Sequence, residues 1–169
     1  MTEKQQQSLN TIIAALPDDC QAAFRAVAEH AIALGYMPAA KGGGSYVDFT
    51  KSKVKRTILK INLNHTPPLL GMKFYAFSAY TGVFQEALEE RVRYYAKLQY
   101  EIHPHCTGCM QRRNGRCHKP EGYTLTLPDG QQGFLCGFGI IPLPSFTAEH
   151  VPEVKAALDI QNAYFEAEG

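Results

Sequence analysis

The stretch His103–Gly137 reads HPHCTGCMQRRNGRCHKPEGYTLTLPDGQQGFLCG and holds four of the five cysteines in the chain. Cys106 and Cys109 form a C-x2-C pair with a glycine immediately before the second thiol. A gap of two residues lets both sulfur atoms point into one tight turn, and glycine tolerates the positive φ that such a turn often needs. Cys117 follows through a segment that contains Asn-Gly, a strong turn signal.

The fourth thiol belongs to a predicted β-hairpin. Tyr123–Leu127 alternates between apolar and polar residues like a strand, Pro128–Gly130 provides a turn, and Gln131–Cys136 runs back as a second strand. A hairpin of this length returns Cys136 to the neighbourhood of Cys117. Three thiols are therefore close in sequence, and folding is expected to deliver the fourth.

The pattern predicts a tetrahedral zinc site on Cys106, Cys109, Cys117 and Cys136. Such a site has no open coordination position, and closed zinc sites are usually structural. Ligation by four cysteines also suits an iron–sulfur cluster, which is one alternative. Two disulfides or free thiols are a further alternative, disfavoured because the chain shows no secretory signal.

Histidines beside the cysteines leave the ligand set open. His105 or His118 could complete a site of three thiolates and one imidazole, and His103 also flanks the cluster. A site that kept a water on the metal could be catalytic, because zinc lowers the pKa of bound water. The sequence has no glutamate in an H-E-x-x-H or H-x-E arrangement. No motif identifies a reaction, so the sequence leaves open whether the protein is an enzyme.

Length and composition favour a single α+β domain over residues 1–169, with residues 103–137 as a zinc-knuckle hairpin within it. The net charge of +1 gives no global electrostatic drive toward nucleic acid or anionic membranes. No apolar run reaches the roughly 18 residues of a membrane helix. The polar N-terminus lacks the apolar core of a signal peptide, so we expect a cytoplasmic protein with no membrane partner.

Apolar periodicity predicts an antiparallel sheet packed against helices. The first helix is expected to be capped by Ser8 and the second to start at Asp18 or Asp19 and end at Gly35. The later predicted elements are strands at Tyr46–Phe49, Lys51–Leu63 and Gly71–Phe77, a long helix at Phe84–Tyr100, and a last helix with Pro152 in its first turn.

Three side chains have simple structural interpretations. Cys20 lies on the apolar stripe of the second helix and is read as a buried small hydrophobe without a reactive role. His30 falls one position off that stripe and is expected to face solvent. Glu89 and Arg93 form an i,i+4 pair of favourable orientation on the long helix.

Three functional hypotheses remain. The first is a zinc-stabilised binding or interaction domain, with aromatic residues of Phe74–Phe84 lining a pocket for a small ligand. The second is an enzyme of unidentified class that uses His65 or the histidines near the metal. The third is a nucleic-acid-associated protein that contacts phosphates through Lys51–Arg56 and Arg112–Arg116. The amphipathic last helix packs on the body or, in a homo-oligomer, on a partner subunit.

Serine in place of Cys106 or of Cys136 is expected to remove about one equivalent of zinc and the order of the hairpin, since metal binding and folding of such segments are coupled. Elemental analysis of each purified variant measures the bound zinc. Full zinc occupancy in both variants would contradict the ligand assignment.

Overall fold

The computed structural model describes residues 1–73, 82–97, 122–136, 140–143 and 146–167. These residues fall into two compact units. The first comprises Met1–Met72 together with Pro142–Gly169, and the second comprises Lys73–Ile141. The prediction of a single domain stays a prediction.

The first helix, α1, spans Glu3–Ala14 and begins earlier than expected. Its N-cap is Thr2, whose hydroxyl accepts from the Gln5 amide at 3.3 Å while the Gln5 side chain accepts from the Thr2 amide at 2.7 Å. This reciprocal capping box satisfies two backbone donors that the helix leaves unpaired. The prediction that Ser8 caps the helix is wrong, because its hydroxyl donates back to the Lys4 carbonyl inside the helix.

Helices α2 (Asp18–Ala33) and α4 (Val151–Ala167) carry the apolar stripes that their sequences predict. Gly35 ends the α2 region with a φ of 90°, which suits a glycine after a helix. His30 of α2 is bonded to Asp159 of α4 at 2.7 Å, and only 25% of its side chain is exposed. The expectation that His30 simply faces solvent is therefore wrong.

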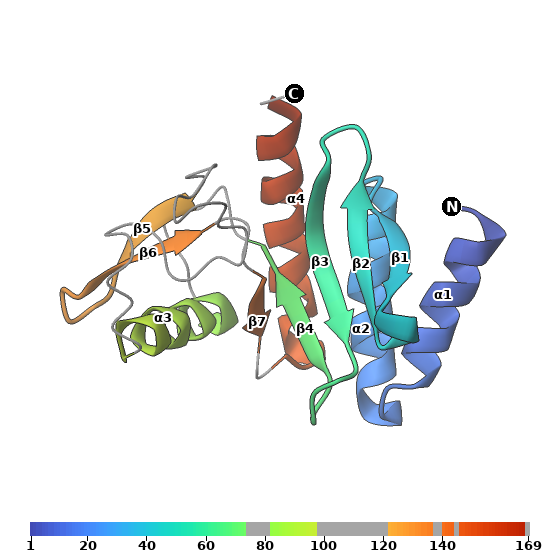
Figure 1. Cartoon of the computed structure of the whole chain (residues 1–169), viewed down its shortest axis with the longest axis horizontal. Helices are drawn as coiled ribbons and strands as arrows, with labels where there is room; N and C mark the ends of the chain where they lie inside the picture. Colours follow the sequence, from blue (N-terminus) through green and yellow to red (C-terminus); the bar gives the residue numbers. More distant parts are fainter. Residues whose placement is uncertain (74–81, 98–121, 137–139, 144–145, 168–169) are drawn as a thin grey trace. The chain divides into compact units, whose positions relative to one another are not determined.

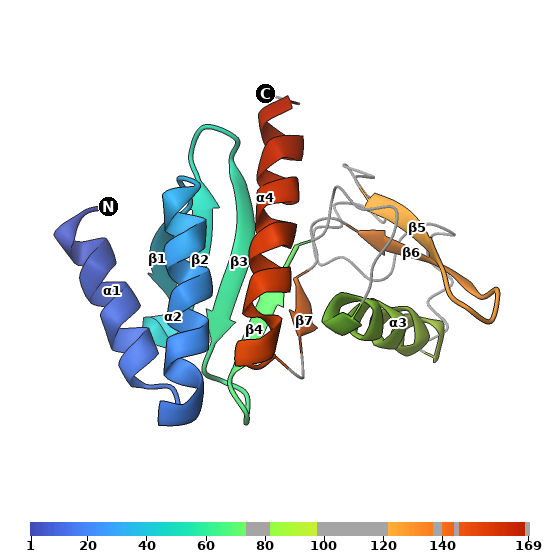
Figure 2. The ribbon, with the colours of Figure 1, turned by 180° about the vertical axis from the view of Figure 1, so that it is seen from behind.

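The sheet has the strand order β1-β2-β3-β4-β7. Its strands are β1 Met37–Lys41, β2 Tyr46–Lys51, β3 Arg56–Asn62, β4 Leu69–Met72 and β7 Ile141–Leu143. Strands β1 to β4 pair in succession, each antiparallel to the next. Helices α1, α2 and α4 lie on one face of the sheet, as the two opposite views show (Figure 1, Figure 2). The predicted α+β class, with an antiparallel sheet against helices, is confirmed.

Three strand predictions differ from the structure. Strand β4 begins at Leu69, before the predicted start at Gly71, and ends at Met72. Strand β1 was not expected, and its glycine-rich exit forms a short 3-10 turn at Gly42–Gly44. The predicted strand Lys51–Leu63 is divided, since Lys51 ends β2 and the chain turns before β3 begins at Arg56. Lys55 in that turn has a φ of 52°, a left-handed conformation that a strand does not contain.

The core of the first unit lies between the helices and the inner face of the sheet. Val47 is paired with Ile61 and Phe49 with Leu59, and all four are essentially inaccessible to solvent. The neighbouring register positions carry polar residues: Lys60 is paired with Asp48 at 3.5 Å and lies over the Tyr46 ring. The alternation follows from the period of two in a strand with one buried face.

The second unit contains α3 (Gly82–Lys97) and the hairpin of β5 (Gly122–Thr126) and β6 (Gln132–Cys136). The hairpin is the one that the sequence predicts, and its register places Cys136 opposite Gly122. Gly130 turns the chain with a φ of 82°, and its amide donates to the Leu127 carbonyl.

Helix α3 packs against β6 at the side chain of Val92. A Cβ added to Gly133 would lie 2.5 Å from Val92 Cγ1, so the close approach requires a glycine at this position. Arg93 is paired with Asp129 of the hairpin turn at 2.9 Å. The predicted pair of Glu89 with Arg93 is wrong, because Glu89 instead accepts a hydrogen bond from Gln85.

Within the described ranges of the chain, none of the helices has both the length and the apolar character that crossing a bilayer requires.

Gly133→Ala is expected to destabilise the contact of α3 with the hairpin by about 1–3 kcal/mol, because the new methyl group overlaps Val92. Hydrogen exchange of the α3, β5 and β6 amides reads this local stability. A loss of stability would be specific to this contact, since replacing glycine with alanine at an unstrained site usually stabilises a protein by about 0.4–1 kcal/mol.

The matched control is the double variant with Val92→Ala, which removes the overlapping methyl groups. Its loss of stability is expected to be smaller than the sum of the two single losses by about 1 kcal/mol. Strictly additive losses would contradict the contact.

Candidate functional site

The first unit contains a cavity of about 270 Å³ beside the start of α2. We call it the Phe24 pocket. Pro17, Asp19, Cys20 and Phe24 line it from the α2 side. Pro17 and the first turn of the helix form its rim, while Phe24, one turn further along, is 2% exposed and forms part of the core.

The second wall comes from the loop that leads into β4. Pro67 and Pro68 line the cavity there, and the Thr66–Pro67 peptide bond is cis. Each proline ring fixes its own φ and lacks an amide hydrogen. This wall therefore presents apolar ring surface and few backbone donors.

The third wall comes from the last residue of β7 and from residues 146–148, which precede α4. Leu143, Phe146, Thr147 and Ala148 line the cavity from this side. The Phe146 ring meets Phe24 edge to face, with centroids 5.2 Å apart and planes at 82°. Edge-to-face contact is a favoured geometry for aromatic pairs, so the two rings hold each other in place.

His150 fixes the backbone of the third wall. Its Nδ1 accepts a hydrogen bond from the Thr147 amide at 3.0 Å and lies 3.0 Å from the Thr147 hydroxyl. The His150 amide in turn donates to the Thr147 carbonyl at 3.2 Å. Because these bonds close a short ring, Thr147 keeps one orientation beside the cavity.

Cys20 is the single thiol among the residues that line the pocket. It is half-buried, and its Sγ–H donates to the Pro17 carbonyl at 3.2 Å. Burial raises the pKa of the Cys20 thiol, and the neighbouring Asp19 carboxylate raises it further. A thiol whose pKa is raised is a poor nucleophile, because the thiolate is the reactive form. The interpretation of Cys20 as unreactive agrees with this environment, although the side chain is not fully buried.

The chemistry of the lining suits binding better than reaction. The lining residues are mostly apolar, and their polar side chains are one carboxylate, one thiol and one hydroxyl. They include no histidine and no pair of carboxylates that could share acid–base work. An apolar cavity with a few polar groups at its edge is the usual form of a small-molecule site.

The predicted metal site lies almost wholly outside the described residues. This holds for Cys106, Cys109 and Cys117, and for Cys136 only the backbone, at the end of β6, is described. The described part of the chain contains no cluster of three or more histidine, cysteine or acidic side chains suited to a metal ion. The zinc prediction, with its four cysteine ligands, stays a prediction.

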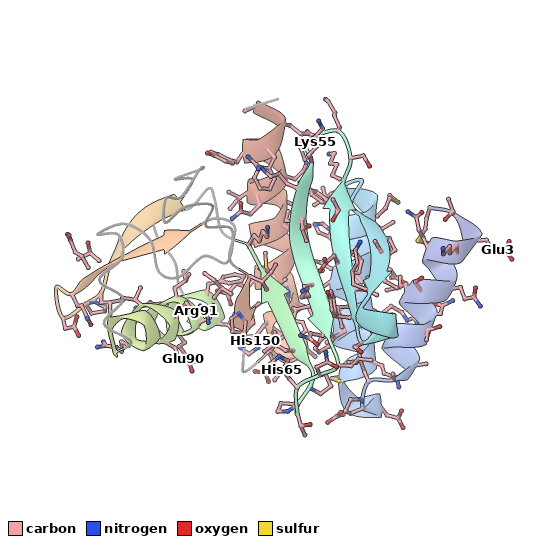
Figure 3. All side chains as sticks on the ribbon, viewed as in Figure 1. Glu3, Lys55, His65, Glu90, Arg91 and His150 are labelled. Atoms are coloured by element: carbon pink, nitrogen blue, oxygen red, sulfur yellow. The ribbon has the colours of Figure 1, made fainter. Side chains whose placement is uncertain are left out.

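The predicted histidine and aromatic sites lie partly within and partly outside the described residues. His103, His105 and His118 lie outside the described ranges, while His65 is exposed in the loop before β4. Figure 3 shows His65 and His150 at one end of the sheet and Lys55 at the other. Of the aromatic segment Phe74–Phe84, residues 74–81 are not described, so the predicted pocket there is untested. The Phe24 pocket is a different site.

The basic cluster at Lys51–Arg56 is partly engaged within the protein. Lys51 Nζ donates to the Leu34 carbonyl at 2.9 Å, to Asn162 Oδ1 at 3.0 Å and to Glu166 Oε1 at 2.6 Å. It joins β2 to the end of α2 and to the last turns of α4. Because its three donors are used, Lys51 has no proton left for a phosphate. The second cluster, Arg112–Arg116, lies outside the described residues.

Tyr36 lies beneath this lysine. Lys51 Nζ is 5.5 Å from the centre of the Tyr36 ring, which is completely buried. Burial raises the pKa of Tyr36 to about 12, with a further contribution from Glu166. The Lys51 cluster is therefore a structural junction, while burial and the Glu166 carboxylate favour the neutral form of the tyrosine.

No local pattern in the sequence indicates the Phe24 pocket. Its walls come from positions between 17 and 24, from residues 67–68, and from residue 143 with residues 146–148, which only the fold brings together. Proline and phenylalanine at these positions are equally typical of turns and of core. No protein-family model, no curated protein and no solved structure matches the chain. Function must therefore be inferred from its own side chains.

Lys51→Met is expected to lower the free energy of unfolding by about 1–3 kcal/mol, since it removes a half-buried donor of three hydrogen bonds. Lys53→Met is the matched control, because Lys53 is exposed on the same turn and should change stability by less than about 0.5 kcal/mol. Chemical denaturation of the three proteins measures the difference, and equal losses in both variants would contradict the junction.

The same comparison has a defined pH dependence. Lys51 lowers the pKa of Glu166 below its ordinary 4.5, through a hydrogen bond and charge attraction. A lowered carboxyl pKa contributes stability that is present above the ordinary value and is lost as the pH falls through the lowered one. The difference between wild type and Lys51→Met should therefore shrink below about pH 4.5. The part of the stability difference that comes from the hydrogen bonds of Lys51 to Leu34 and Asn162 should persist at low pH.

Proposed function

We propose that this protein is a ligand-binding domain in which the Phe24 pocket holds a small, largely apolar molecule. A zinc ion on Cys106, Cys109, Cys117 and Cys136 would stabilise the hairpin of the second unit. The observation that carries the proposal is a cavity whose three walls each carry phenylalanine or proline rings.

The size of the cavity limits the ligand. Pockets for drug-sized ligands run from roughly 300 to 1,000 Å³, and a dry cavity of about 150 Å³ accommodates benzene. A volume of about 270 Å³ lies between these values. The pocket therefore suits a single ring with a short substituent, or an aliphatic group of that size.

The described surface favours a small ligand over a protein partner. Among the described residues, the large hydrophobic side chains classed as exposed are Met1 and Ile160, which are far apart in sequence. An interface for a stable partner usually needs a contiguous apolar centre. The engagement of Lys51 likewise weakens the nucleic-acid hypothesis.

The zinc part of the proposal is supported by the sequence spacing and by the hairpin register. In the hairpin, Cys136 is paired with Gly122. Gly122 follows Cys117 by only five residues in the sequence. Paired residues in an antiparallel ladder have Cα atoms about 4.5–5.5 Å apart.

A binding experiment with a blocked pocket tests the ligand proposal. Single-ring probes such as benzyl alcohol and phenol are expected to show saturation transfer from the wild-type protein, with dissociation constants of about 1 mM. Ala148→Trp should abolish the signal, because Ala148 lines the pocket and is exposed enough to be replaced without disturbing the core.

The matched control is Ala156→Trp, which places the same ring on an exposed position of α4 that does not line the pocket. It should bind the probes as the wild type does. Absence of binding to the wild type, or equal binding by the two tryptophan variants, would overturn the proposal.

A further inference from the structure

The Phe24 pocket has one charged side chain among its lining residues, the carboxylate of Asp19. No hydrogen bond or ion pair of this side chain occurs with another described residue. The neighbouring Asp18 differs, because its carboxylate accepts from Gln21 at 3.0 Å and does not line the cavity. Asp19 therefore has an unmatched negative charge at the rim of an apolar site.

The helix end does not cancel this charge. The N-terminus of α2 is equivalent to roughly half a positive charge. Its first turn carries two carboxylates, Asp18 and Asp19, and the N-cap Pro17 makes no side-chain capping bond. Two negative charges therefore outweigh the helix dipole, and none of the residues lining the pocket is basic. A ligand with a carboxylate or phosphate would meet net repulsion.

The pKa of the Cys20 thiol also responds to the negative charge of Asp19. Its pKa is raised mainly by burial, and the next cause is the Asp19 carboxylate. The Asp19 contribution to this shift disfavours an anion and favours a cation, whereas the burial contribution disfavours a charge of either sign. Cys20 lines the cavity together with Asp19 and Phe24.

The aromatic pair offers a second contact for a cation. The rings of Phe24 and Phe146 stand nearly perpendicular, and both residues line the cavity. Ammonium groups are attracted to aromatic faces within about 6 Å of the ring centre. A carboxylate beside aromatic rings is a recurrent arrangement for recognising amines because both contacts favour positive charge.

We infer that the ligand of the Phe24 pocket is an amphiphilic cation, an ammonium group joined to one small ring or aliphatic group. Asp19 binds the ammonium at the rim, and the rings of Phe24 and Phe146 hold the apolar part. This inference rests on the proposed binding function and specifies the chemical class of its ligand.

Three probes of similar size and different charge test the inference: benzylamine, benzyl alcohol and benzoate. Their dissociation constants for the wild-type protein are measured by NMR titration at low salt. Benzylamine is expected to bind about tenfold more tightly than benzyl alcohol, from an exposed ion pair together with a cation–π contact. Benzoate is expected to bind more weakly than the alcohol, and added salt should reduce the preference for the amine.

Asp19→Asn should reduce the preference for benzylamine to about twofold or less, while the affinity for benzyl alcohol stays unchanged and reports an intact pocket. Asp18→Asn is the matched control and should keep the preference. Equal wild-type affinities for amine and alcohol, or a preference that survives in Asp19→Asn, would overturn the cation inference and leave the binding function standing. If the wild type binds none of the probes, both fall together.

Discussion

The burial of one apolar face of the five-stranded sheet determines the arrangement of the first unit. Val47, Phe49, Leu59 and Ile61 point to this face, and they can leave water only beneath the helices. Burial of each such side chain is worth about 1.5–3 kcal/mol, so covering this face outweighs any single polar contact. The start of α2, the loop before β4 and residues 146–148 meet because α2 packs on this face and both β4 and β7 are strands of the same sheet. The Phe24 pocket is the space that remains where the three meet.

Much of this fold could be predicted from period and turn chemistry. The stripes of α2 and α4, the hairpin with its Pro-Asp-Gly turn and the α+β class follow from local patterns. Strand β1 was missed because Met-Pro-Ala-Ala has little β propensity, and it forms only as the partner of β2. The local sequence groups Lys51 with the other basic residues of one predicted strand. Its hydrogen bonds to Leu34 and Asn162 could not be predicted, because these residues belong to elements far away in the sequence. Arg93 likewise pairs with Asp129, which is 36 residues away in the sequence, and not with Glu89 on its own helix.

The candidate site was less predictable than the fold. Cysteine spacing is local information, so the sequence could nominate a metal site, but the described residues leave that site untested. A pocket made from three distant segments has no such signature. Asp19 in the sequence is an ordinary acidic residue in a first helical turn, where carboxylates are favourable. Its role as the one charged group at the edge of an apolar cavity becomes visible only when Pro67 and Phe146 are placed opposite it.

The two polar features of the first unit lie at opposite ends of the sheet, with the turn that carries Lys55 at one end and His65 and His150 at the other (Figure 3). Sites separated in this way, with no shared partners, usually contribute to stability independently. Substitutions at exposed wall positions such as Ala148 are accordingly expected to leave the Lys51 junction intact, and changes at that junction need not alter what the cavity accepts. Ligand preference can therefore be redesigned at the exposed rim of the cavity, while Phe24 and Leu143 have to be kept because they also belong to the core.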